Sequence, residues 1–97
     1  MPETIQIKLI ITGRVQGVFF RAKTKKTADR LGIKGYVKNL LDGSVEAMLK
    51  GDSSIVAKMV EWCSKGPSAS RVDHIISKKI EQSTEQSGDF YKFEIRY

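Results

Sequence analysis

The strongest constraint on the fold is a change of hydrophobic period on either side of residues 13–21. Before this stretch, Ile5, Ile7, Leu9 and Ile11 alternate with Gln6, Lys8, Ile10 and Thr12. A period of two predicts a half-buried strand. After Gly17 the apolar and small residues recur at helical spacing, and Gly32 is a typical helix stop. The chain must therefore pass from a strand into a helix within the sequence Gly-Arg-Val-Gln-Gly-Val-Phe-Phe-Arg.

The second part of the chain begins with a hairpin and a further helix. Residues 34–50 predict two strands joined by a turn at Asp42-Gly43. A helix follows, with Asp52 or Ser53 as its cap and Gly66-Pro67 as its end. Its apolar residues form two adjacent stripes, one of Ile55, Met59 and Trp62 and one of Val56, Val60 and Cys63.

The C-terminal third predicts strands again. Residues 71–82 favour a strand with irregular alternation, residues 83–89 a polar loop, and residues 91–97 a closing strand. The resulting order is β-α-β-β-α-β with a short extra C-terminal strand. This order is typical of the α+β, ferredoxin-like (split βαβ) fold, an antiparallel sheet with two helices on one face.

Length and composition favour a small globular protein. A chain of 97 residues with 40% hydrophobic residues predicts a single domain over residues 1–97. No apolar run approaches the length of a membrane span, and residues 1–4 lack a secretion signal. The single cysteine, Cys63, cannot form an intrachain disulfide. We expect a cytoplasmic monomer without a membrane partner.

The positive charge is concentrated just after the strand-to-helix junction. The net charge is +6, and one cluster of cations comprises Arg21, Lys23, Lys25, Lys26, Arg30, Lys34 and Lys38. First turns of helices normally favour acids. Gly13 and Gly17 allow the backbone to aim several N–H groups at one point, as in phosphate-binding loops. Two interpretations of this stretch remain open. It binds an anion, with the guanidinium of Arg21 as a planar donor, or its glycines only shape a β-to-α turn and Arg21 is solvated.

Asn39 is the second candidate. It is the only asparagine in the chain, and asparagine is depleted in strands. Alternation places it on the same face as Val37, where it can reach a ligand or water. The alternative is a turn former before Asp42-Gly43. His74 and Cys63 have no partner at a metal-ligand spacing, so we expect structural roles for both and no metal site.

Two segments resemble the signatures of the acylphosphatase family. Ile11 to Arg21 resembles the first, and Gly35-Tyr36-Val37-Lys38-Asn39, with Gly43, Val45 and Gly51, resembles the second. Gly66-Pro67, Ser70-Arg71-Val72 and the ending Phe93 to Tyr97 also look like this family. The resemblance covers nearly the whole chain.

The resemblance implies hydrolysis of acyl phosphates to a carboxylate and inorganic phosphate, without metal or cofactor. Arg21 would bind the phosphoryl group and Asn39 would orient the attacking water. Backbone N–H groups of Arg14, Val15, Gln16, Gly17 and Val18 would hold phosphoryl oxygens. Gly13 and Thr24 would support the site from outside it, and the carboxylate of Tyr97 would orient Arg21.

Two other functions compete with this one. The first is an RNA-binding module that stacks bases on exposed aromatic residues such as Phe19, Tyr36 or Tyr91. The RNP1 pattern is missing, however, because Lys34-Gly35-Tyr36 continues as Val37-Lys38-Asn39. The second is a regulatory domain that binds anions without turnover. We expect small acyl phosphates and phosphate as partners, and no nucleic acid.

Overall fold

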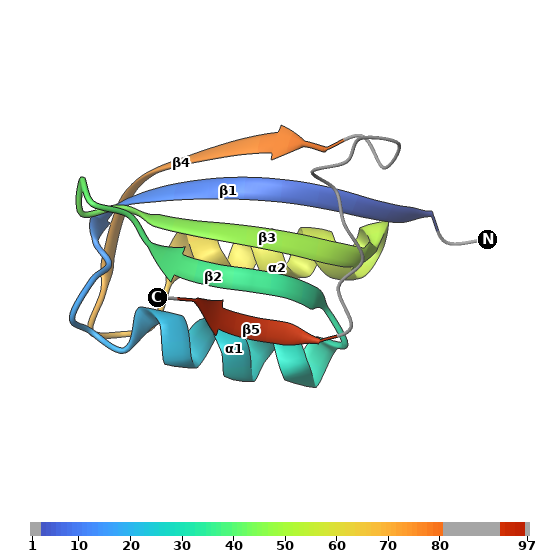
Figure 1. Ribbon diagram of the computed structural model, residues 1–97, viewed down its shortest axis with the longest axis horizontal. Helices are drawn as coiled ribbons and strands as arrows, with labels where there is room; N and C mark the ends of the chain where they lie inside the picture. The colour runs from blue at the N-terminus through green and yellow to red at the C-terminus, as the bar shows by residue number, and fades with distance from the viewer. Residues whose placement is uncertain (1–2, 81–91, 97) are drawn as a thin grey trace.

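The predicted order of strands and helices is confirmed. The computed structural model describes residues 3–80 and 92–96, and its elements are β1 (Thr4–Arg14), α1 (Phe20–Leu31), β2 (Lys34–Asn39), β3 (Val45–Asp52), α2 (Ser53–Lys65), β4 (Arg71–Lys79) and β5 (Phe93–Arg96). Figure 1 shows one twisted sheet with both helices on the same face. Helix α1 packs on β2 and β5, and helix α2 packs on β1 and β3. The ferredoxin-like α+β class therefore holds.

The predicted sheet is antiparallel, and the observed sheet differs from it in the pairing of β5 with β2. The strand order is β4-β1-β3-β2-β5. The pairs β1·β3, β1·β4 and β2·β3 are antiparallel, but β5 pairs parallel with β2. The first three pairings make β1 and β2 run in one direction and β3 and β4 in the other. Strand β5 runs in the direction of β2. The sheet is therefore mixed, with four antiparallel strands and one parallel edge.

The core lies between the sheet and the two helices. Leu9 and Val37 point from the sheet into it, with no exposed surface. Helix α2 buries Val56, Met59 and Cys63, and the neighbouring Trp62 packs partly buried against them. This burial confirms the two predicted stripes. Asp52 is the cap of α2, because its carboxylate accepts a hydrogen bond from the N–H of Ser54 at 2.9 Å.

Strand β4 lies at the sheet edge, and its position explains the irregular pattern of its sequence. Most of its side chains, His74 among them, are exposed, so no buried face imposes a period of two. A bulge separates Thr12 and Gly13 in the pairing of β1 with β4. A Cβ atom on Gly13 would lie 2.1 Å from the carbonyl oxygen of Arg71. Gly13 thus belongs to β1 rather than to the turn, and both its φ of 132° and the close approach of β4 favour glycine there.

Parts of the predicted C-terminal elements lie outside the described residues. These are the end of the strand predicted at residues 71–82, the polar loop at 83–89, and both Tyr91 and Tyr97 of the closing strand. Within the closing strand, Phe93 is buried and Ile95 packs partly buried against the core, which confirms its alternation. Among residues 3–80 and 92–96, none of the helices has the length and apolarity to cross a bilayer.

Candidate active site

Helix α1 begins without the features that usually stabilise a helix N-terminus. Its cap residue is Phe19, which has no side-chain oxygen to accept a hydrogen bond. Phe19 has φ 61° and ψ 22°, the left-handed conformation that costs a non-glycine residue about 1–2 kcal/mol. The first turn holds no acid and carries Arg21 and Lys23 instead. The positive end of the helix dipole is therefore left without a negative partner from the helix itself.

The loop before α1 presents unpaired backbone donors. Within the described residues, none of the N–H groups of residues 15–19 donates a hydrogen bond to another group. Gly17 has φ 73°, and a Cβ atom added to it would touch nothing within 4 Å. Its left-handed backbone, rather than a lack of space, therefore favours glycine at this position. Unpaired N–H groups beside a helix N-terminus form a binding place for an anion.

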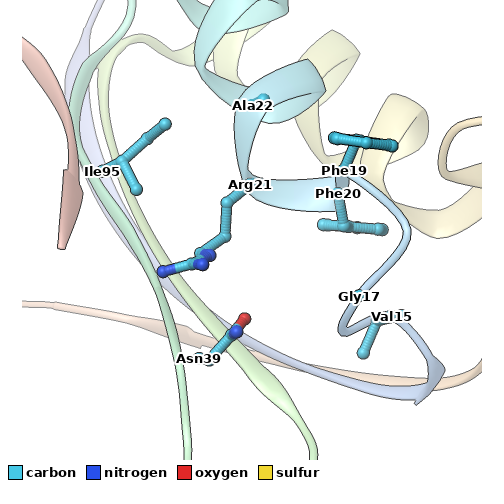
Figure 2. A pocket seen from close by; sticks show the side chains of 8 residues that line it. All are labelled: Val15, Gly17, Phe19, Phe20, Arg21, Ala22, Asn39 and Ile95. Carbon is cyan, nitrogen blue, oxygen red and sulfur yellow. The ribbon is translucent and has the colours of Figure 1, made fainter. Parts of the chain in front are cut away.

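Arg21 and Asn39 line the same cavity. This cavity has a volume of about 300 Å³ and is lined by Val15, Gly17, Phe19, Phe20, Arg21, Ala22, Asn39 and Ile95. Figure 2 shows the guanidinium of Arg21 reaching from the start of α1 toward Asn39 at the end of β2. Two residues far apart in the sequence thus face one space. Asn39 lies two residues after the buried Val37 on β2 and lines the cavity, as expected from the alternation along a strand.

The amide of Asn39 has an unused acceptor. Its Oδ1 atom is covered and accepts no hydrogen bond from any described residue. A covered acceptor without a donor costs free energy, about 1–3 kcal/mol. A water molecule or a ligand that donates to this amide would remove that cost. This acceptor belongs to a residue that lines the same cavity as Arg21.

Strand β5 approaches Arg21 from the opposite edge of the cavity. The Nη1 atom of Arg21 donates to the backbone carbonyl of Arg96 at 3.3 Å. This contact ties the guanidinium to the C-terminal strand, which contributes Ile95 to the cavity wall. The carboxylate of Tyr97 was expected to orient Arg21, but Tyr97 lies outside the described residues.

The side chain of Gln16 connects the loop to the β2–β3 hairpin. Its Nε2 atom donates to the carbonyl oxygens of Leu40 and Ser44, each at 2.8 Å. Leu40 directly follows Asn39, and its own N–H donates to the carbonyl oxygen of Ser44 at 2.8 Å. The amide of Gln16 therefore fixes the distance between the donor loop and the end of β2 that carries Asn39.

The hairpin turn is itself held by Asp42. Its Oδ1 atom accepts from the N–H of Ser44 at 2.9 Å and from the Ser44 hydroxyl at 2.5 Å. These hydrogen bonds to Ser44 hold the pKa of the Asp42 carboxyl below its usual value. A rigid turn gives the two carbonyl oxygens that Gln16 binds a fixed position.

The predicted site residues occupy different places around this cavity. Val15 and Gly17 line it, as do Arg21 and Asn39. Arg14, Gln16 and Val18 belong to the same loop region but are not among the lining residues, and Arg14 is the exposed last residue of β1. Thr24 is buried, and its hydroxyl donates to the carbonyl of Phe20 at 2.7 Å. Thr24 therefore supports the first turn of α1.

Sequence reasoning missed the side chain of Gln16 and several wall residues. Gln16 was expected to act through its backbone only, and Phe20, Ala22 and Ile95 were not singled out. Phe19 was considered only as an exposed aromatic residue. A polar side chain within a glycine-rich loop is a signal for Gln16, but its partners come from a hairpin whose position the sequence does not give.

The remaining candidates have structural environments. Cys63 is buried in the core, and this burial raises the pKa of its thiol to about 12. The thiol is therefore protonated at neutral pH and a poor nucleophile. His74 is exposed on β4. In the described part of the chain, His, Cys, Asp and Glu side chains form no group of three or more that could hold a metal ion.

The RNA-binding interpretation loses one of its aromatic residues. Tyr36 is only 9% exposed, since the guanidinium of Arg96 lies 4.2 Å from the centre of its ring. Its hydroxyl donates to Glu46 at 2.8 Å. The face of the ring is thus covered by a side chain of the protein, and Tyr36 is not available to stack on a base.

The fold and the cavity together define a ferredoxin-like protein with a cavity at the start of its first helix. The family model for acylphosphatases matches residues 7–95. Acylphosphatases from Anaeromyxobacter dehalogenans and Rubrobacter xylanophilus are 40% and 42% identical, covering 100% and 97% of this chain and 100% and 82% of theirs. The crystal structure of acylphosphatase from Bacillus subtilis superposes with a TM-score of 0.87 and 34% identity, over 96% of this chain and 99% of that one. The chain belongs to the acylphosphatase family.

Proposed function

We propose that the chain hydrolyses the carboxyl-phosphate bond of acyl phosphates at the cavity between α1 and β2. Membership of the family makes it an acylphosphatase. The assignment of roles to individual residues is our proposal. The observation that carries it is the position of Arg21 and Asn39 on one cavity, next to unpaired N–H groups of the loop.

The phosphoryl group is bound by the loop and by Arg21. N–H groups between Arg14 and Val18 donate to its oxygens, and the guanidinium of Arg21 adds a planar, permanently charged donor. Charge in the transition state of phosphoryl transfer is spread over these oxygens. Donors held in place before the reaction stabilise that charge without further rearrangement.

The water is held by Asn39. Its Oδ1 atom accepts a hydrogen bond from the water and directs the oxygen lone pair toward phosphorus. The new P–O bond forms as the P–O bond to the acyl group breaks, and the electron pair of that bond leaves with the carboxylate. Both water protons remain on the phosphate, so the products are a carboxylate and dihydrogen phosphate. The leaving carboxylate is a weak base, which removes the need for a general acid.

The proposal is tested with benzoyl phosphate as substrate and inorganic phosphate as inhibitor. The native chain hydrolyses benzoyl phosphate at the same rate with and without EDTA. Asn39→Ala lowers kcat about 100-fold, because the water loses its orientation. The inhibition constant of phosphate changes less than about twofold in this variant, since the phosphate donors remain. Full turnover in Asn39→Ala, or loss of turnover in EDTA, would contradict the proposed mechanism.

A further inference from the structure

Phe19 combines two features that packing does not explain. It is the only non-glycine residue with a positive φ among residues 3–80 and 92–96. Its side chain is 78% exposed, so burial of the ring does not offset the cost of the left-handed backbone. Backbone strain of this kind persists where it serves a site. An exposed aromatic ring at a strained position therefore needs a reason outside the fold.

The surroundings of Phe19 point to the cavity. Phe19, Ala22 and Ile95 form what we call the apolar rim, and all three line the cavity that holds Arg21 and Asn39. Ala22 is exposed and Ile95 is half-buried, whereas Phe20 and Val15, deeper in the same wall, are almost fully buried. The mouth of the cavity is thus lined with apolar surface that none of residues 3–80 and 92–96 covers.

The geometry of the reaction assigns this rim to one part of the substrate. Figure 2 shows Ile95, Ala22 and Phe19 in an arc on one side of Arg21, with Asn39 on the other side. The attacking and leaving oxygens of phosphoryl transfer lie roughly in line. If water is held at Asn39, the acyl group departs on the opposite side, toward the arc.

The charge of the lining decides the chemistry of that acyl group. Arg21 is the only charged residue among the described residues that line the cavity, and the phosphoryl group occupies it. No second lining cation is left for an additional carboxylate or phosphate on the acyl group. Apolar surface and an aromatic ring instead match an apolar acyl group, preferably a planar one that can lie against the ring of Phe19.

We infer that Phe19 is a specificity-determining residue that selects acyl phosphates with an apolar, preferably aromatic, acyl group. This inference rests on the proposed function of the same cavity. Native chain and variants are compared on benzoyl, acetyl and succinyl phosphate, which share one phosphoryl group and differ only in the acyl part. The native chain has a kcat/KM for benzoyl phosphate about tenfold or more above that for acetyl phosphate. Succinyl phosphate is no better than acetyl phosphate.

The informative variant is Phe19→Gly, because glycine adopts the left-handed conformation, removes the ring and adds no side-chain cap that would compete with a bound anion. It lowers kcat/KM for benzoyl phosphate about five- to tenfold, mainly through KM, and leaves acetyl phosphate within about twofold. The urea midpoint of unfolding stays the same or rises, since strain is relieved. The matched control is Ile76→Ala, which removes an apolar side chain that is 64% exposed on β4 and does not line the cavity. This control keeps the native preference.

The outcomes separate the inference from the proposed function. A chain that hydrolyses none of the three substrates contradicts the proposed function, and the inference falls with it. Hydrolysis with an equal loss on benzoyl and acetyl phosphate in Phe19→Gly contradicts the inference alone. An unchanged preference in that variant, or a native preference for succinyl phosphate, contradicts it as well. A selective loss on benzoyl phosphate supports it.

Discussion

The two helices of this protein begin in opposite ways. Helix α2 starts at Asp52, whose carboxylate caps the N–H of Ser54, an arrangement that stabilises a helix by about 1 kcal/mol. Helix α1 starts at Phe19 without a side-chain cap and with a left-handed backbone, and its first turn carries Arg21. Neither helix has an acid in its first turn. The missing cap and the strain together cost α1 about 2 kcal/mol relative to α2.

The difference follows from what each N-terminus faces. The start of α2 follows β3 directly, and the N–H groups of Ser53 and Ser54 donate to the carbonyl oxygen of Glu3 and to Asp52 Oδ1. The start of α1 lines the cavity with Asn39, and an internal cap there would compete with a bound anion. Under the proposed function the N-terminus of α1 binds the anion, so its donors must stay unsatisfied within the chain, and the local instability is offset by packing elsewhere, such as that of the buried Phe20.

The largest expected effect comes from the only arginine of the α1 N-terminus. Arg21→Gln lowers kcat/KM for acyl phosphates about 10³-fold, because the transition state loses its charged donor. It also abolishes stabilisation by inorganic phosphate, which at about 100 times its Kd adds about 2.7 kcal/mol to the free energy of unfolding of the native chain. Initial rates and thermal unfolding with phosphate measure both effects.

The matched control is Lys23→Gln. Lys23 is a cation in the same turn of α1 as Arg21, but it does not line this cavity. Its activity stays within about twofold of the native value, because Lys23 is exposed and does not line the cavity, and an exposed charge in high dielectric contributes little. An equal loss in both variants would mean that the general positive charge of the first turn, rather than the fork of Arg21, binds the anion.

An intermediate effect is expected at Gln16. Gln16→Met keeps the length of the side chain but removes both hydrogen bonds to the hairpin, so kcat/KM falls about tenfold as loop and Asn39 lose their spacing. The free energy of unfolding falls by about 1–2 kcal/mol in urea titrations. Gln16→Glu is worse than Gln16→Met in both measurements, since a carboxylate would face two carbonyl oxygens. If the glutamate variant were equal to the native chain, Gln16 would have no positioning role.

The smallest effect on activity is expected at the other helix. Asp52→Ala removes the cap of α2 and lowers the free energy of unfolding by about 1 kcal/mol, while kcat/KM for benzoyl phosphate stays within about twofold. Chemical denaturation and initial rates of the same preparation give both values. A large loss of activity in this folded variant would show that the two helix starts are coupled and would remove the contrast between them.

Much of the fold could be predicted because its signals are local. The period of two in β1 and the stripes of α2 lie within a few residues, and both were predicted correctly. The cap of α2 was predicted at Asp52 or Ser53, and the structure shows it at Asp52. The irregular β4 was harder to assign because an exposed edge strand has no buried face to impose a pattern. The parallel pairing of β5 with β2 was missed, since the direction of an edge strand depends on the whole strand order.

The candidate site also has features that the sequence predicts and features that only the tertiary structure reveals. The sequence by itself determined the chemistry of the loop: glycine at residue 17, a cation in place of an acid at Arg21, and a polar residue at Asn39 on the core face of a strand. Only the tertiary structure decided that Asn39 and Ile95 share a cavity with Arg21, and that Gln16 binds the hairpin. The physical reason is the separation along the sequence over which each kind of interaction acts. Backbone preferences and periodicity act between neighbours, whereas the contacts of a site are set by how the two helices pack on the sheet.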